Sequence, residues 1–221
     1  TDESGGSDTL IAHIQAYLVQ SGQWNPADEL SFTPALCNRI DRNTGGIVVA
    51  AKTAEALRLL NEAIRAHALK KSYLCIVHGQ LQPPEGQISF FLRRDEKRKQ
   101  VTVHRTQIPG AKTAVTLYRT LAVRDGLSLL HCELVTGRTH QIRAHMAALG
   151  HPLLGDCKYG TAEQNRPYQE RFQALYSYQL AFEGLPAHCA LAYLNGRTLT
   201  VKKVPFVQKY FPDIAISLFG N

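Results

Sequence analysis

The dipeptide Asp125-Gly126 restricts the fold of this chain more than any other short feature. It separates two strand-like segments, TAVTLYRTLAV before it and LSLLHCELV after it. Asp-Gly between two such apolar runs is a strong signal for a β-hairpin with a two-residue turn. The sequence therefore predicts a sheet with antiparallel pairing.

Further helices and strands are expected on both sides of this hairpin. Helical periodicity predicts helices in DTLIAHIQAYLVQSG, with Asp8 as the N-cap, and in TAEALRLLNEAIRAHA, with Thr53 as the N-cap. The segment TGRTHQIRAHMAALG is expected to begin as a loop and to continue as a helix that ends at Gly150. Residues 1–9 are expected to be a linker or a truncated N-terminus, and residues 10–221 one domain.

Strand patterns outnumber helical ones in the rest of the chain. KSYLCIVHG alternates so that Tyr73 and Cys75 share one face while Leu74 lies on the other. GGIVVAAK, ALYSYQLAF and RTLTVKKV are expected to form further strands. Because there is no regular alternation of strand and helix and no internal repeat, the predicted class is α+β, with a mixed, mainly antiparallel central sheet flanked by helices.

Composition narrows the kind of protein. The 221 residues include 25 Lys and Arg against 18 Asp and Glu, a net charge of +7, which favours a polyanionic partner such as nucleic acid. The five cysteines are an odd number without a CxxC pair, which argues against a disulfide framework or a structural zinc site and fits a reducing compartment. No apolar run reaches the ~18 residues of a membrane helix, so no membrane partner is expected.

Several familiar catalytic motifs are absent. The sequence has no GxxxxGK[ST], no GxGxxG, no HExxH and no GxSxG. A cluster of histidines and cysteines invites a metal-site hypothesis: His131, Cys132, His140, His145, His151 and Cys157. However, His140 and His145 are five residues apart and lie on different faces of a helix, so the spacing fits zinc poorly and no metal is expected.

The stretch NRIDRNTGG places one carboxylate, Asp41, between Arg39 and Arg42. It could be an ordinary salt-bridged turn, or it could keep Asp41 ionised for chemistry. A second unusual charge is Arg143, a cation near the start of a predicted helix, where the helix dipole disfavours it. An anion should compensate Arg143, and Asp41 or a bound phosphate is the candidate.

A basic stretch is the remaining candidate for contact with a polyanion. It comprises Arg93, Arg94, Lys97, Arg98, Lys99, His104 and Arg105. A backbone-binding edge and a merely solvated face are both compatible with it, because no aromatic residue is interleaved.

Four segments, in order, resemble the motifs of RluA-type pseudouridine synthases. NRIDRNTGG is similar to H-R-L-D-x-x-T-S-G, KKSYLCIVHGQL to K-x-Y-x-A-x-V-x-G, and AKTAVTLYR to K-x-A-x-T-x-Y/F. VTGRTHQIRAHMAALGHPLLGDCKYG nearly matches T-G-R-T-H-Q-I-R-V-H-x-x-x-x-G-H-P-x-x-G-D-x-x-Y-G. The resemblance covers about Leu36 to Gly160, and the tail is similar to the closing strands of the family.

The resemblance implies site residues. Asp41 would be the nucleophile, Tyr73 would stack on the target base, and Arg143 would pair with the nucleophile. Arg39 would help to fill the space left by a flipped base. Residues expected to contact RNA, or alternatively to support the loop, are Arg39, Arg138, Thr139, His140 and Gln141.

The implied reaction is the isomerisation of specific uridines in structured RNA. No redox change occurs, so no cofactor is expected. The resemblance favours large-subunit (23S-type) ribosomal RNA, with transfer RNA as an alternative. A cytoplasmic location is expected, and a monomer is expected because no apolar surface stripe stands out. A catalytically silent RNA-binding module and a metal-dependent hydrolase are the competing functions.

The sequence also departs from the family pattern. Asn38, Ile40 and Gly46 replace the usual His, Leu and Ser, and Tyr176 stands where the tail has His. The strand with a K-P-x-G loop that opens the catalytic domain of relatives is not found before Leu10, and neither is an S4-type RNA-binding domain.

Overall fold

The computed structural model describes residues 8–28 and 32–214, which group into two compact units. The smaller unit comprises segments within 1–39, 48–69 and 183–195, and the larger one segments within 40–47, 70–182 and 196–221. Of the expected linker over residues 1–9, only Asp8 and Thr9 are among the described residues. No helix in the described part of the chain is both long and apolar enough to cross a membrane.

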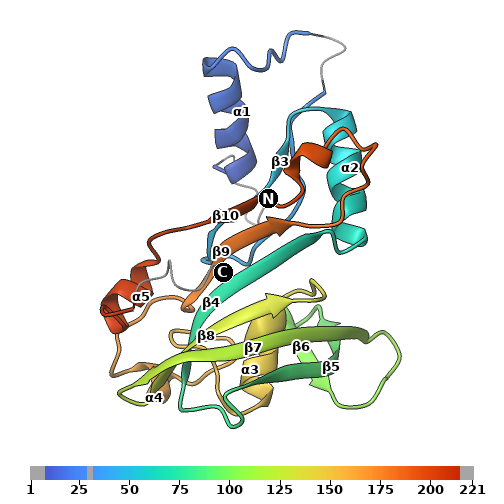
Figure 1. Ribbon diagram of the computed structural model, residues 1–221. Coiled ribbons are helices and arrows are strands. Elements are labelled where there is room, and N and C mark those ends of the chain that lie inside the picture. Colours follow the sequence, from blue (N-terminus) through green and yellow to red (C-terminus); the bar gives the residue numbers. More distant parts are fainter. Residues whose placement is uncertain (1–7, 29–31, 215–221) are drawn as a thin grey trace. The chain divides into compact units, whose positions relative to one another are not determined.

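The larger unit is built on one sheet with the strand order β10-β9-β4-β8-β7-β5-β6, and β2 pairs with β9 (Figure 1). The strands are β2 (Gly45–Gly46), β4 (Leu69–His78), β5 (Glu85–Asp95), β6 (Gln100–His104), β7 (Lys112–Arg124), β8 (Leu127–Leu134), β9 (Leu175–Phe182) and β10 (Thr198–Thr200). The β2/β9 pairing is parallel, whereas β4/β8, β7/β8, β5/β7, β5/β6 and β10/β9 are antiparallel. The predicted α+β class with a mixed, mainly antiparallel sheet is confirmed.

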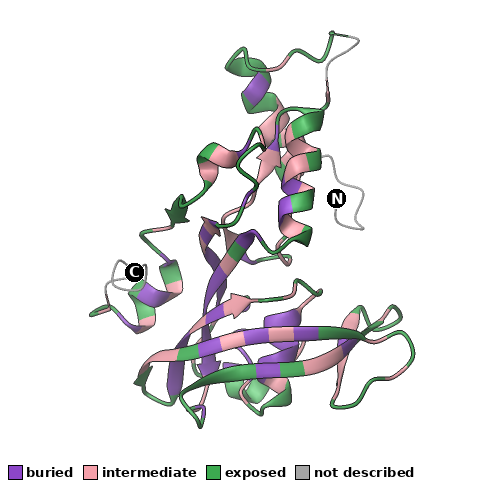
Figure 2. Cartoon of the chain, turned by 45° about the vertical axis from the view of Figure 1, so that its right-hand side comes forward, coloured by how far each residue is buried: buried purple, intermediate pink, exposed green. Residues whose placement is uncertain are grey.

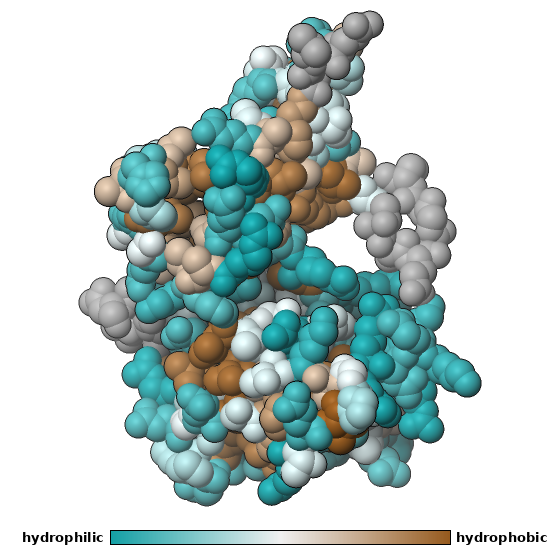
Figure 3. Space-filling model, turned by 90° about the vertical axis from the view of Figure 1, so that its right-hand side faces the viewer, coloured by the Kyte–Doolittle hydropathy of each residue, from teal (hydrophilic) through white to brown (hydrophobic). Residues whose placement is uncertain are grey.

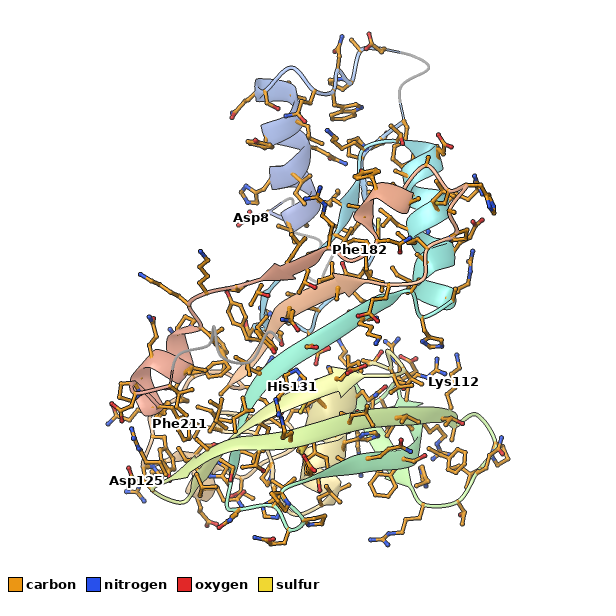
Figure 4. The ribbon with its side chains drawn as sticks, viewed as in Figure 1. Asp8, Lys112, Asp125, His131, Phe182 and Phe211 are labelled. Carbon is orange, nitrogen blue, oxygen red and sulfur yellow. The ribbon has the colours of Figure 1, made fainter. Side chains whose placement is uncertain are left out.

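The hairpin expected at Asp125-Gly126 joins β7 to β8. Asp125 has a φ of 50° and Gly126 a φ of 74°, so both turn residues take the left-handed conformation that matches the strand twist. Lys112 and Asp125 mark the two ends of β7 (Figure 4). The turn dipeptide thus correctly located the longest strand and its partner.

Strand β4 runs through the core with apolar residues on both faces. Tyr73 and Cys75 belong to one buried cluster, together with Ile142 of helix α3 (Gln141–Ala148). Leu74 and Ile76 belong to a second cluster, which includes Phe211 just after helix α5 (Pro205–Tyr210). Most of β4 is buried, as the purple strand in Figure 2 shows, and the division of its side chains between the two clusters confirms the predicted alternation. A short helix, α4 (Ala162–Asn165), follows the loop after α3.

The smaller unit holds two helices and a short two-stranded sheet. Its elements are α1 (Leu10–Gln20), β1 (Ala35–Leu36), β3 (Ala50–Ala51), α2 (Ala54–Arg65) and the 3-10 turn η1 (Ala192–Leu194). Thr53 caps α2 as predicted, since its Oγ1 accepts from Ala56 N at 3.1 Å. The prediction that Asp8 caps α1 is wrong: Thr9 accepts from Ala12 N, while Asp8 instead contacts His13.

The strand expected over GGIVVAAK is also wrong as a single element. It is divided into β2, which pairs with β9 in the larger unit, and β3, which pairs with β1 in the smaller one. Gly46, the last residue of β2, has a φ of 116°, and a Cβ there would come within 2.1 Å of the Ser177 carbonyl oxygen. The close approach to β9 requires a glycine in a conformation that ends the extended run.

Candidate active site

Arg143 is the centre of the site in the larger unit. Its side chain is buried, and Nε and Nη2 donate to the two carboxylate oxygens of Asp156 at 2.6 and 2.9 Å. The third nitrogen, Nη1, lies 3.5 Å from Oδ2 of Asp41. One guanidinium therefore connects a fully buried carboxylate with one that keeps part of its surface, a use of its planar fork that Lys could not reproduce.

Burial and charge compete in this pair. Burial alone would raise the pKa of Asp156, but the hydrogen bonds and charge of Arg143, with main-chain bonds from Lys158 and Tyr159, lower that pKa overall. Burial alone would likewise lower the pKa of Arg143, yet Asp156 first and Asp41 second raise it overall. Both groups therefore stay ionised, and the charge of Arg143 is fixed in place beside Asp41.

The turn that carries Asp41 is fixed by the segment leading into β9. The main-chain N–H of Thr44 donates to the Asp41 carbonyl at 3.0 Å. The buried amide of Gln173 donates to the Arg42 carbonyl at 2.7 Å and to the Thr44 hydroxyl at 3.1 Å. The Asp41 carboxylate is thus presented by a hydrogen-bonded turn whose backbone is held from two sides.

Tyr73 lies near this carboxylate, in strand β4. It is almost fully buried, and burial raises the pKa of its hydroxyl, with Ser177 opposing the shift and the charge of Asp41 adding to it. The hydroxyl therefore stays protonated at neutral pH. Its stacking on a target base stays a prediction.

Gln141 has the environment of a positioning residue. It is buried, and its Oε1 accepts from the Thr136 hydroxyl and from Arg138 N at 2.8 and 3.0 Å. Its Nε2 donates to Val115 O and to the Thr116 hydroxyl at 3.0 and 2.9 Å. Since every donor and acceptor of the amide is used within the chain, this environment favours the alternative in which Gln141 supports the turn that leads into α3.

His140 joins this turn to the ion-paired centre. It begins α3 with a left-handed φ of 51°, and its Nδ1 lies 2.9 Å from the Tyr159 hydroxyl, which accepts from Val101 N at 2.8 Å. Burial raises the pKa of Tyr159 to about 12, so its proton is available for Nδ1. Burial also lowers the pKa of His140 despite the nearby Asp41 charge. The lowered pKa favours a neutral ring, and a Tyr159 hydroxyl that donates to Nδ1 corresponds to the tautomer with its proton on Nε2.

The other expected RNA contacts are more exposed. Arg138 is exposed and donates from Nε to Thr113 O at 3.0 Å. Arg138 and Thr139 line a cavity of about 290 Å³, which Arg94 and Lys112 also line. Figure 3 shows one face of the protein, on which hydrophilic side chains surround smaller apolar patches. Arg39 is exposed at the edge of the smaller unit, and its role stays a prediction.

Three residues of the site escaped the sequence reasoning: Asp156, Tyr159 and Gln173. The argument that Arg143 needs an anion was correct, but Asp156 provides the closer one and Asp41 the more distant one. Asp156 and Tyr159 stood in the G-D and Y-G positions of the motif and could have been found there. Among the described residues, no three His, Cys, Asp or Glu side chains form a group that could hold a metal.

A carboxylate beside a buried guanidinium, next to a protonated tyrosine, is a set of groups that nucleophilic and electrostatic catalysis use. The RNA pseudouridylate synthase family model matches residues 15–148. An uncharacterised RNA pseudouridine synthase of Mycoplasma genitalium is 37% identical over 72% of this chain and 50% of its own length. The ribosomal large subunit pseudouridine synthase D of Nitrosomonas europaea is 36% identical over 71% of this chain and 46% of its own length.

Solved structures share the fold. The human RNA pseudouridylate synthase domain containing 4 superimposes with a TM-score of 0.68, at 20% identity over 91% of this chain and 82% of that one. The chain belongs to the RNA pseudouridylate synthase family, in its RluA-type branch. It spans about half the length of the curated relatives it matches.

Proposed function

We propose that this chain isomerises specific uridines to pseudouridine in structured RNA, with Asp41 as the essential carboxylate. The observation that carries the proposal is the 3.5 Å contact of Asp41 with Arg143, whose other nitrogens are held by the buried Asp156. The arrangement keeps a cation beside Asp41 whether or not RNA is bound. An ordinary surface salt bridge would not use a buried arginine with a dedicated second carboxylate.

The chemistry suits these groups. The N1–C1′ bond of uridine breaks, the base turns over, and C5 joins C1′, while the C5 proton is lost and N1 gains a proton. Asp41 acts as nucleophile on the flipped uridine, stabilised as an anion by Arg143. Tyr73 stacks on the base, a contact that recovers part of the few kcal/mol spent on unstacking it.

Large-subunit ribosomal RNA is the proposed substrate, and the net charge of +7 supports a nucleic-acid partner. The printed name of the Nitrosomonas europaea relative supports the ribosomal choice. Arg39, Arg138, Thr139 and His140 are proposed to contact the RNA around the flipped base. We propose that the protein works as a monomer in the cytoplasm, without a cofactor.

Tritium release from RNA labelled at C5 of uridine tests the proposal. This chain and a version extended to the length of its relatives are assayed on ribosomal and transfer RNA, each beside Asp41→Asn. The matched control is Asp213→Asn, an exposed carboxylate that pairs with Arg124. We expect release that Asp41→Asn abolishes and Asp213→Asn retains. RNA binding without release from any version would contradict the proposal and favour a silent RNA-binding module.

A further inference from the structure

A second cavity of the larger unit is lined in part by Arg143. It measures about 360 Å³, within the size range of small-molecule sites. Its wall is formed mainly by polar and cationic side chains and one aromatic ring: Asn43, Gln100, Arg143, Lys158, Arg171 and Phe172. Because Arg143 faces both this cavity and Asp41, the cavity adjoins the proposed reaction centre.

Phe172 is the unusual member of this wall. Nearly half of its surface, 48%, is exposed, whereas the residues after it, Gln173 and Ala174, are buried. Its backbone is held rigidly: a Cβ on Gly155 would come within 2.1 Å of the Phe172 carbonyl oxygen, and Ala174 N donates to Leu154 O at 2.8 Å. A fixed backbone therefore presents a large apolar ring to solvent at the edge of the site.

Two cations accompany this ring. The guanidinium carbon of Arg171 lies 5.9 Å from the centre of the Phe172 ring, and Arg171 itself is exposed. Lys158 donates one proton of its ammonium group to Lys99 O at 2.7 Å and keeps two for other acceptors. Exposed aromatic faces between Lys and Arg are the elements with which proteins bind unpaired nucleotides, since the ring stacks on a base and the cations neutralise phosphates.

We infer that this cavity is a subsite for the unpaired nucleotide next to the target uridine. Its base stacks on Phe172, and its phosphate lies between Lys158 and Arg171. The inference rests on the proposed function, because the neighbour is defined relative to a uridine placed at Asp41. It makes the substrate an RNA whose target uridine and one adjacent residue are both unpaired.

Binding of short oligoribonucleotides tests the subsite without requiring turnover. The probes are fluorescent single-stranded nonamers with one central uridine among cytidines, and an abasic residue replaces each flanking nucleotide in turn. We expect Phe172→Ala to weaken binding of the intact probe about 5-fold to 100-fold, and Phe172→Tyr to retain it. Leu199→Ala, which alters a side chain 51% exposed in the same unit, is the matched control and should bind as wild type.

The abasic probes locate the stacked base. At one flanking position, an abasic probe should bind the wild type as weakly as the intact probe binds Phe172→Ala. The same abasic probe should bind Phe172→Ala no more weakly than the intact probe does. Lys158→Gln and Arg171→Gln should each reduce the salt dependence of binding by about one unit of slope. Equal binding of the intact probe by Phe172→Ala and wild type would overturn the subsite. A loss of affinity in Phe172→Ala that no abasic probe reproduces with the wild type would also overturn it.

The two proposals fail in different ways. If neither this chain nor its extended version releases tritium from either RNA, the proposed function fails, whatever the binding assay shows. If wild type releases tritium and Asp41→Asn does not, while Phe172→Ala binds every probe as wild type, only the subsite fails. Thermal unfolding of each variant checks that it folds.

Discussion

The two sides of Arg143 differ in how their polar groups are satisfied. Toward the core, Asp156 and Gln141 are buried, and the chain itself supplies all of their partners. Toward the 360 Å³ cavity, Phe172 and Arg171 are exposed. Under the two proposals above, the buried side fixes the geometry for chemistry, and the exposed side keeps surface for a substrate. Substitutions on the first should therefore affect folding and turnover, and those on the second should affect binding.

Removal of Arg143 should have the largest effect on stability. Arg143→Met leaves the carboxylate of Asp156 buried without its cation, which costs about 3–5 kcal/mol for a broken buried pair. Urea denaturation measures this loss. Asp41→Asn, which removes only the 3.5 Å contact of a partly exposed carboxylate, should cost about 1 kcal/mol or less. Equal losses in the two variants would contradict the distinction between the two carboxylates.

Helix α3 also carries a buried titratable side chain that, unlike Arg143, has no hydrogen-bond partner. His145 is fully buried, neither ring nitrogen has a hydrogen-bond partner, and burial lowers its pKa to about 4. Since the unfolded state, with a pKa near 6.5, binds the proton more readily, stability is complete above about pH 6.5 and falls as the pH drops toward 4. The total loss from this residue is about 3 kcal/mol.

Urea denaturation between pH 7 and pH 4 tests this dependence. His145→Leu should flatten the curve in that window, because it removes the buried imidazole. His131, whose pKa burial also lowers to about 4, accounts for part of the slope that remains. An unaltered slope in His145→Leu would show that His145 is not the group responsible.

The turn before α3 should be next in order of effect. Gln141→Leu removes an amide that satisfies Val115 O and Arg138 N, and the lost hydrogen bonds should cost about 1–3 kcal/mol of folding stability. Gln141→Glu, of similar shape, keeps the acceptor but loses the donor. Thermal unfolding should show a loss in both variants, with Gln141→Glu no milder than Gln141→Leu, because it buries a carboxylate against the Val115 carbonyl oxygen. A neutral effect of Gln141→Leu would return this residue to the candidates for RNA contact.

Surface cations should have the smallest effect on folding. Arg138→Ala and Arg94→Ala change side chains that line the 290 Å³ cavity, and each should alter unfolding by about 0.5 kcal/mol or less. Filter binding with ribosomal RNA should nevertheless show weaker, less salt-dependent affinity. If either variant loses as much free energy of unfolding as Gln141→Leu, that arginine contributes to folding as the buried residues do.

Local sequence signals predicted the elements whose pattern is strong over many residues. The alternation in β4 and the Asp125-Gly126 turn determine their own pairing, because side-chain period and turn geometry leave few registers. The division of GGIVVAAK into two strands was not predictable, since it depends on the close approach of Gly46 to Ser177, 131 residues further along the chain.

The site was predictable to the extent that its residues lie in the motifs. Asp41 and Arg143 do come together, and Tyr73 lies near them. Gln173 gave no sequence signal, because a single buried amide before an apolar strand looks like any loop residue, and only the tertiary structure brings it to Arg42 and Thr44. Likewise, no sequence signal indicated that the Phe172 ring would be exposed, since its backbone lies against Gly155, which is distant in the sequence.

The most direct test of the contrast between the two sides of Arg143 separates turnover from binding. Pseudouridine formation under single-turnover conditions, measured over a range of enzyme concentrations, gives the rate at saturation and the Kd for wild type, Asp156→Asn and Phe172→Ala. The contrast predicts that Asp156→Asn lowers the saturating rate with little change in Kd, and that Phe172→Ala raises Kd with little change in the rate. The same change in both constants for the two variants would contradict it.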